Sequence, residues 1–147
     1  MTIRDTDGDI PSVLIAHSFP LMVEALSGLV AGLGFDVVER LDNGTAVRAA
    51  MAASPVDIAL LDTSDRIDAV EILREIRVGG APTRVVLLCG TLDPAPLMAA
   101  VELGVDGLLL TTAPVDTVHA CVSAVGGGRQ WVDQSLMKVV LDRVTAR

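Results

Sequence analysis

The sequence predicts an α/β domain built around a parallel β-sheet. Three observations lead to this fold class. Short apolar runs recur along the 147 residues, a segment with helical spacing of apolar residues follows each run, and glycine or proline residues separate many of these segments. Unbroken apolar runs are typical of strands buried on both faces, and regular alternation with helices indicates right-handed βαβ units. The length fits a single domain with its own core.

Five strands are expected. Four of them are continuous apolar runs, whereas the second along the chain is mixed in character, which suits an edge strand. In chain order the strands are expected at residues 13–16, 35–39, 58–61, 85–88 and 108–110.

Six helices are expected between and after the strands, at residues 22–33, 43–53, 67–78, 93–101, 115–125 and 134–144. Their apolar residues recur three or four positions apart, as on one face of a helix. Short polar side chains stand near several of the predicted starts. We expect Ser18 to cap the first helix, Asn43 to cap the second, and Asp93 to open the fourth.

The formal charge of −8 limits what this domain can bind. A nucleic-acid surface needs clustered Lys and Arg, so DNA binding is expected only from a domain beyond these residues. Cys89 and Cys121 fall inside apolar segments, and we expect both to be small buried hydrophobic residues in a reducing compartment. Without a secretion signal or an apolar run of about 18 residues, a cytoplasmic protein with no membrane span is expected. Residues 1–11 should form a flexible lead-in.

Polar or reactive side chains directly follow the predicted strands. They are His17 and Ser18 after the first strand, Asp62 to Asp65 after the third, Cys89 to Thr91 after the fourth, and Thr111 and Thr112 after the fifth. In open parallel sheets, binding sites form at the carboxyl ends of the strands. The sequence therefore places its candidate site among these residues.

Several segments together resemble the receiver domain of bacterial two-component response regulators, most of all the LuxR-type (NarL/FixJ) class. They are the run 13–16 with Pro20-Leu21, the turn Asp42-Asn43-Gly44, the segment 55–62, the segment 104–110 and the Gly-rich stretch 126–131. The resemblance covers about residues 12–136. It implies the three-layer αβα fold of the flavodoxin-like (CheY-like) type, with five parallel strands in the order 2-1-3-4-5. It also implies a receiver domain at 12–128 and a C-terminal extension or linker helix at 129–147, leading in the family to a helix-turn-helix domain.

The same resemblance makes Asp62 the phospho-acceptor position. In the family, an acidic pair after the first strand joins this aspartate to hold Mg²⁺, and a hydroxyl and a lysine after the fourth and fifth strands stabilise the phosphoryl group. Here His17 and Ser18 replace the acidic pair, Cys89 replaces the hydroxyl residue and Thr111 replaces the lysine. Because phosphoryl transfer depends on positioning and charge neutralisation, this pocket looks degenerate.

We therefore expect an atypical receiver that acts in signal transduction and transcriptional regulation as a dimerisation and protein-interaction module. The expected partners are a second copy, through the first and fifth helices or the fourth and fifth, and a sensor kinase or other regulatory protein. No catalytic activity of its own, no metal and no other cofactor is expected, with Mg²⁺ required only if phosphorylation is retained.

Two alternatives remain open. In the first, Asp62 is phosphorylated in a phosphorelay, with Asp65 or Asp68 as substitute oxygen ligands for the metal. In the second, the less charged pocket binds a small metabolite, which would make the domain a ligand sensor. A softer metal held by His17 and Asp62 would have too few ligands to be stable.

Overall fold

The computed structural model describes residues 10–91 and 93–145. Most of the expected lead-in, residues 1–9, lies outside the described residues. The strands are β1 (Ser12–Ala16), β2 (Asp36–Leu41), β3 (Ile58–Asp62), β4 (Arg84–Cys89), β5 (Gly107–Leu110) and β6 (Trp131–Val132). The helices are α1 (Pro20–Gly32), α2 (Gly44–Ala53), α3 (Ala69–Val78), α4 (Pro94–Glu102), α5 (Val115–Gly126) and α6 (Gln134–Thr145).

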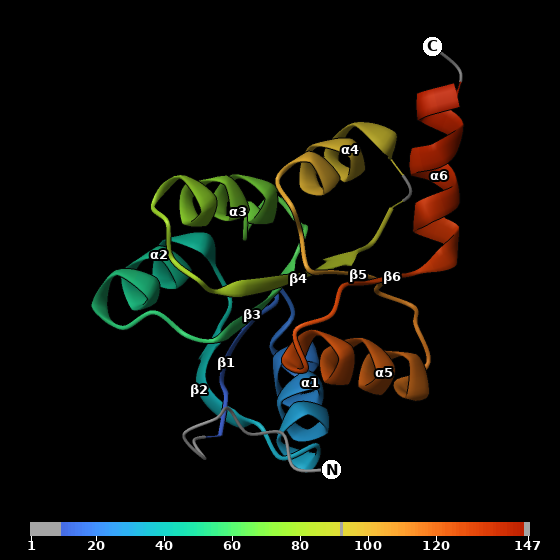
Figure 1. Ribbon diagram of the computed structural model, residues 1–147. Helices are drawn as coiled ribbons and strands as arrows, with labels where there is room; N and C mark the ends of the chain where they lie inside the picture. The colour runs from blue at the N-terminus through green and yellow to red at the C-terminus, as the bar shows by residue number, and fades with distance from the viewer. Residues whose placement is uncertain (1–9, 92, 146–147) are drawn as a thin grey trace.

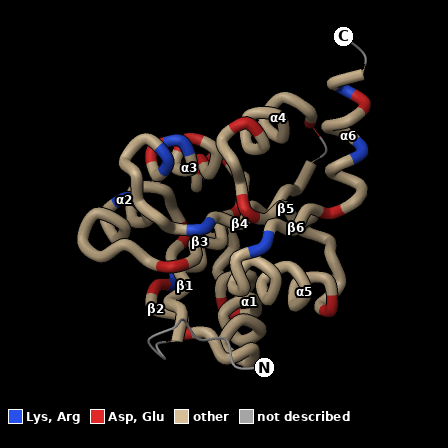
Figure 2. Tube along the Cα trace, viewed as in Figure 1, with Lys and Arg blue, Asp and Glu red and all other residues tan. Residues whose placement is uncertain are grey.

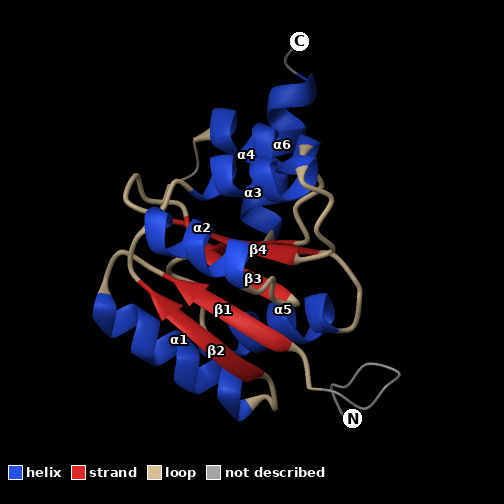
Figure 3. Cartoon of the chain, turned by 90° about the vertical axis from the view of Figure 1, so that its left-hand side faces the viewer, coloured by secondary structure: helices blue, strands red, loops and turns tan. Residues whose placement is uncertain are grey.

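The elements form three layers around one parallel sheet, as the sequence predicts. The strand order is β2-β1-β3-β4-β5-β6 (Figure 1). Helices α1 and α5 cover one face of the sheet, and α2, α3 and α4 cover the other (Figures 1 and 3). The expected strand order is confirmed, but the sheet of the described chain has a sixth strand, β6, where five were expected.

The unbroken apolar runs are explained by two cores, one on each face of the sheet. In β1, Leu14 and Ala16 point into the core under α2, α3 and α4, while Val13 and Ile15 point into the core under α1 and α5. Because side chains alternate along a strand, a central strand with a core on both faces needs apolar residues at every position. In contrast, β2 is an edge strand with alternating exposure, which accounts for its mixed sequence.

Local polar contacts fix where some helices begin. The Asn43 side chain accepts a hydrogen bond from Ala46 N at 2.8 Å, which confirms it as the cap of α2. Asp93 likewise accepts from Ala95 N at 3.2 Å at the start of α4. The prediction for Ser18 is wrong, because Phe19 occupies the N-cap position of α1 and the Ser18 hydroxyl bonds elsewhere. Gly44 is required by close packing, since a Cβ there would lie 2.4 Å from the Ile67 carbonyl oxygen.

The C-terminal segment joins the edge of the sheet. Trp131 N and Asp133 N donate to the carbonyl oxygens of Asp106 and Leu108, both at 2.9 Å, and so attach β6 to β5. Helix α6 then lies beside α4, with Leu136 and Val140 buried in the core. The predicted division at residues 128 and 129 stays a prediction, although both elements of the extension contact the rest of the domain.

Both cysteines are buried, as expected. Over the described residues, none of the helices is long and apolar enough to cross a membrane. Lys, Arg, Asp and Glu residues are distributed over the outer faces and loops, with no concentrated basic surface in the view of Figure 2.

Candidate functional site

The candidate site lies at the carboxyl edge of the sheet, where β1 and β3 end side by side. Asp62 is the last residue of β3 and is 6% exposed. Its Oδ2 atom accepts hydrogen bonds from Ser18 Oγ at 2.9 Å and from Ser18 N at 3.4 Å. The structure thus brings two of the predicted site residues into direct contact. The bond also explains why Ser18 does not cap α1.

His17 is buried beside this carboxylate, with 1% exposure. Its Nδ1 atom accepts a hydrogen bond from Phe19 N at 3.0 Å and lies 3.8 Å from Asp62 Oδ2. Because Nδ1 acts as an acceptor, a neutral His17 carries its ring proton on Nε2. That nitrogen is buried and has no hydrogen-bond partner within the described part of the chain.

Cys89 and Thr111 complete the set at the ends of β4 and β5. Burial raises the pKa of the Cys89 thiol to about 11, and the negative charge of Asp62 adds to the shift. The thiol is therefore protonated at neutral pH. Thr111 Oγ1 is buried without a partner among the described residues, and so is the hydroxyl of Ser64 in the loop after β3.

No Lys or Arg side chain of the described residues forms an ion pair with Asp62, and the imidazole of His17 is its one potential cationic neighbour within 4.0 Å. The edge therefore holds a single buried carboxylate that no Lys or Arg of the described residues pairs with. Such a site lacks the fixed cation that would attract and neutralise a phosphoryl group.

Asp65 and Asp68, the predicted substitute ligands, are both exposed. Asp68 has φ 60°, in the left-handed region, and its carboxylate lies 3.5 Å from Arg48 on α2. Within residues 10–91 and 93–145, no group of three or more His, Cys, Asp or Glu side chains is placed to hold a metal ion. Mg²⁺ prefers several oxygen ligands in octahedral arrangement, so the side chains around Asp62 do not fit this ion.

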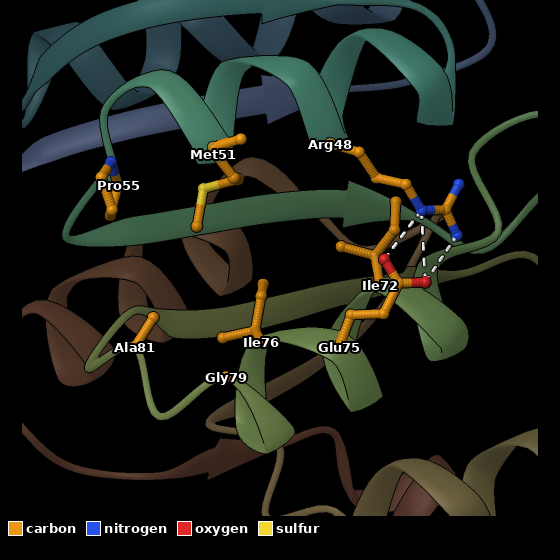
Figure 4. A pocket seen from close by; sticks show the side chains of 9 residues that line it. Arg48, Met51, Pro55, Ile72, Glu75, Ile76, Gly79 and Ala81 are labelled. Atoms are coloured by element: carbon orange, nitrogen blue, oxygen red, sulfur yellow. Dashed lines mark hydrogen bonds and ion pairs between the residues drawn. The ribbon is translucent and has the colours of Figure 1, made fainter.

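Hollows in the described part of the chain include two on the side of the sheet that α2, α3 and α4 cover. One, of about 80 Å³, adjoins the site on the α3–α4 side of the sheet and is lined by Thr63, Cys89 and Thr91 over apolar residues. The other is an open groove of about 300 Å³ between α2 and α3, bounded at one end by the ion pair of Arg48 with Glu75 (Figure 4). Its floor residues Ile72 and Ile76 are already buried, so the groove offers little further apolar area.

Sequence reasoning missed one group of this edge, the backbone N–H of Phe19, which binds His17. Thr63 and Ser64 were expected at this edge from their position directly after a predicted strand, but no contact was predicted for them. The Thr63 hydroxyl donates to Leu88 O at 2.9 Å.

Comparison with known proteins supports the class suggested by the fold. No family model matches the chain. It is 25% identical over 134 residues to the "Nitrate/nitrite response regulator protein homolog" of Haemophilus influenzae, covering 89% of this chain and 64% of that protein. It is 29% identical over 130 residues to the "Probable transcriptional regulatory protein NarL" of Mycobacterium tuberculosis, covering 85% of this chain and 59% of that protein. The chain thus spans less than two thirds of the length of these relatives.

Solved receiver domains have the same fold. The signal receiver domain of NarL from Mycobacterium tuberculosis matches with a TM-score of 0.75 and 27% identity, over 82% of this chain and 99% of that one. The isolated receiver (REC) domain of RcsB from Salmonella enterica was determined with the phosphomimetic BeF3-. It matches with a TM-score of 0.80 and 18% identity, over 90% of this chain and 99% of that one. A LuxR-family response regulator from Aurantimonas matches with a TM-score of 0.82 and 16% identity, over 93% of this chain and 99% of that one.

The fold, with an aspartate at the end of β3, is that of the receiver domains of response regulators. The homologues of the chain are NarL-type response regulators, and its structural neighbours include receiver domains of RcsB, NarL and LuxR-family regulators.

Proposed function

We propose that this domain is an atypical receiver, which acts in transcriptional regulation as a dimerisation and protein-interaction module and is not controlled by conventional aspartate phosphorylation. One observation carries the proposal. The buried Asp62 carboxylate is hydrogen-bonded to Ser18 and has no Lys or Arg partner among the described residues. DNA would be bound through a separate C-terminal domain, as the greater length of the relatives suggests.

The chemistry of phosphoryl transfer supports this proposal. The incoming phosphoryl group is negative and would meet a second negative charge at Asp62. A working site neutralises both charges with a metal ion and a positioned cation. Loss of one electrostatic stabiliser typically lowers a rate by about 10²–10³, so loss of several should leave phosphorylation negligible.

Exposed apolar side chains near the same edge suit contact with another regulatory protein. Phe19 and Leu21 at the start of α1 are 64% and 81% exposed, and Val115 at the start of α5 is 50% exposed. Large apolar side chains gathered on a surface are typical of interaction sites. By contrast, part of the α4 side is covered by α6. We therefore assign partner docking to the N-terminal ends of α1 and α5, in a cytoplasmic protein without catalytic activity.

The test is incubation of the protein with acetyl phosphate and Mg²⁺ or Mn²⁺, followed by intact mass measurement. We expect no mass increase of one phosphoryl group. As a matched control, Asp62→Asn should likewise show no mass increase after the incubation. An increase that disappears in Asp62→Asn would overturn the proposal in favour of a phosphorylation-competent receiver.

The hollow beside Cys89 favours a second candidate function, a sensor of a small ligand. Its volume of about 80 Å³ leaves room for a molecule of only a few heavy atoms, since liquid water takes about 30 Å³ per molecule. A ligand that binds the folded state raises the melting temperature. Thermal-shift screening of small polar metabolites tests this function, with Ala100→Leu, which fills the hollow, as the variant that should lose the response.

A further inference from the structure

We propose that Asn43 is a site of spontaneous deamidation that the native fold keeps inactive, so that the reaction is confined to molecules in which the start of α2 has opened. Asn43 is the single asparagine of the sequence and is followed by Gly44. In a flexible chain, the backbone nitrogen after an asparagine attacks the side-chain amide carbon. Glycine favours this attack because it has no Cβ to hinder the approach and leaves the backbone free to rotate.

The reaction needs only water as a second reactant. The bond between Gly44 N and Asn43 Cγ forms, the bond between Cγ and Nδ2 breaks, and the side-chain nitrogen leaves as ammonia with the hydrogen that Gly44 N has lost. The product is a five-membered succinimide. Water then opens this ring at one of its two carbonyl groups, which gives aspartate or isoaspartate at position 43.

Hydrogen bonds hold both reacting groups in an unreactive arrangement. The Asn43 side chain accepts from Ala46 N at 2.8 Å and donates to Asp42 Oδ1 at 2.9 Å. Gly44 N donates to Arg66 O at 2.9 Å, which disfavours the deprotonated nitrogen that must attack. Ring closure also requires Gly44 N to eclipse Cβ of Asn43, whereas the extended ψ of 157° keeps the two apart. The folded turn therefore opposes the reaction at the amide, at the nitrogen and at the backbone between them.

The loop before α3 fixes this turn in place. Arg66 Nε donates to Asp42 O at 2.9 Å, in addition to the bond from Gly44 N to Arg66 O. Gly44 is buried, and a Cβ there would lie 2.4 Å from Ile67 O, so the backbone has no room to move toward this loop. The rotation that the reaction requires must therefore separate the start of α2 from residues 66–67. Such local opening needs less free energy than global unfolding.

The two products differ in their effect on the fold. Aspartate keeps a side-chain oxygen for the Ala46 N–H and remains a good helix cap. Isoaspartate passes the main chain through the former side chain, which inserts one more carbon before Gly44. Because Gly44 is packed against Ile67 O, this longer backbone does not fit the closed turn. Molecules that form isoaspartate therefore stay open at the start of α2.

Intact mass measurement tests the proposal, because each deamidation replaces an amide by an acid and the chain has one asparagine. The protein is incubated at mildly alkaline pH with and without guanidinium chloride. The matched control is Asn43→Ser, which keeps a capping side chain without a reactive amide. We expect deamidation at least about tenfold slower in the native protein than in the unfolded chain, and no comparable mass increase in Asn43→Ser. Equal rates would overturn the protection, and an unfolded chain that does not react would overturn the site itself.

A second comparison tests the role of the loop. Arg66→Ala removes the bond to Asp42 O, whereas Arg74→Ala removes an exposed pair with Glu71 and leaves the turn unchanged. We expect Arg66→Ala to raise the rate in the native protein about fivefold and Arg74→Ala to have no effect. All three proteins should react at the same rate in guanidinium chloride. An unchanged native rate in Arg66→Ala would show that residues 66–67 do not protect the site.

Discussion

The two edges of the sheet differ in how fully their polar side chains are hydrogen-bonded. At the amino-terminal edge, Arg77 donates hydrogen bonds to three backbone carbonyl oxygens, those of Thr83, Leu103 and Gly104, and pairs with Asp106 at 2.8 Å. The hydroxyl of buried Thr83 donates to Val56 O at 2.7 Å. At the carboxyl edge, three buried polar atoms lack any partner among the described residues: His17 Nε2, Ser64 Oγ and Thr111 Oγ1.

This difference separates residues that stabilise the fold from residues that do not. A buried polar group without a partner destabilises the folded state by about 1–3 kcal/mol, whereas each satisfied bond contributes about 1 kcal/mol. The amino-terminal edge therefore holds the strands and helix ends together. The carboxyl edge keeps polar residues that the fold alone does not require, and these occupy the degenerate phosphorylation pocket.

The largest effect is expected at Arg77. Replacing Arg77 by Ala removes the partner of three carbonyl oxygens and leaves the Asp106 carboxylate with the Val85 N–H as its donor, and should lower the free energy of unfolding by about 3 kcal/mol. The matched control is Arg74→Ala, which removes only an exposed pair with Glu71 and should cost less than about 0.5 kcal/mol. Urea unfolding measures both. Equal losses would show that the amino-terminal edge does not stabilise the fold in this way.

Two threonine hydroxyls that are shielded from water give the most direct contrast between the edges. Thr83→Val removes a hydroxyl that is hydrogen-bonded, and should destabilise the protein by about 1–2 kcal/mol. Thr111→Val removes a hydroxyl without a partner and keeps the shape, so it should stabilise the protein by about 1 kcal/mol. Melting curves of the two variants should shift in opposite directions. A loss of stability in both would mean that Thr111 has a partner, such as an ordered water, in solution.

Much of this arrangement could be predicted from the sequence. The apolar runs identify the central strands because residues buried on two faces leave no polar positions, and Asn43 marks its helix start through a bond only three residues away. The helix cap predicted at Ser18 was wrong because it depends on a distant contact. Ser18 bonds to Asp62 across 44 positions. Strand β6 has two residues and no apolar run, because its place is set by the backbone of β5.

Replacing one aspartate at each edge by asparagine should change the free energy of unfolding by a smaller amount, with opposite signs at the two edges. Asp62→Asn removes a buried charge that lacks a Lys or Arg partner, while the amide oxygen can still accept from Ser18, so the protein should gain about 1 kcal/mol. Asp57→Asn at the amino-terminal edge weakens the bonds to Ser12 N and Oγ, at 2.8 and 3.2 Å, and should cost about 0.5–1 kcal/mol. Loss of stability in Asp62→Asn would show that the charge of this carboxylate stabilises the folded state.

The smallest expected effect concerns the thiols of Cys89 and Cys121, which lie near opposite edges of the sheet. Cys89 ends β4 near Asp62, whereas Cys121 contacts Gly107 at the start of β5. Burial, aided by Asp62, raises the pKa of Cys89 from 9.0 to about 11, and burial alone raises that of Cys121 from 9.0 to about 12. The stabilisation from each protonated thiol is thus complete below pH 9.0 and is lost as the pH rises toward the folded pKa.

The free energy of unfolding should therefore fall above pH 9.0, by about 1 kcal/mol per thiol for the first pH unit. The sequence has no tyrosine and a single lysine, the exposed Lys138, so few other groups titrate in this range. Cys89→Ala and Cys121→Ala should each make the decline shallower. Asp62→Asn should lower the pKa of Cys89 and reduce only that thiol's contribution. An unchanged slope in Asp62→Asn would show that the carboxylate charge does not act on the end of β4.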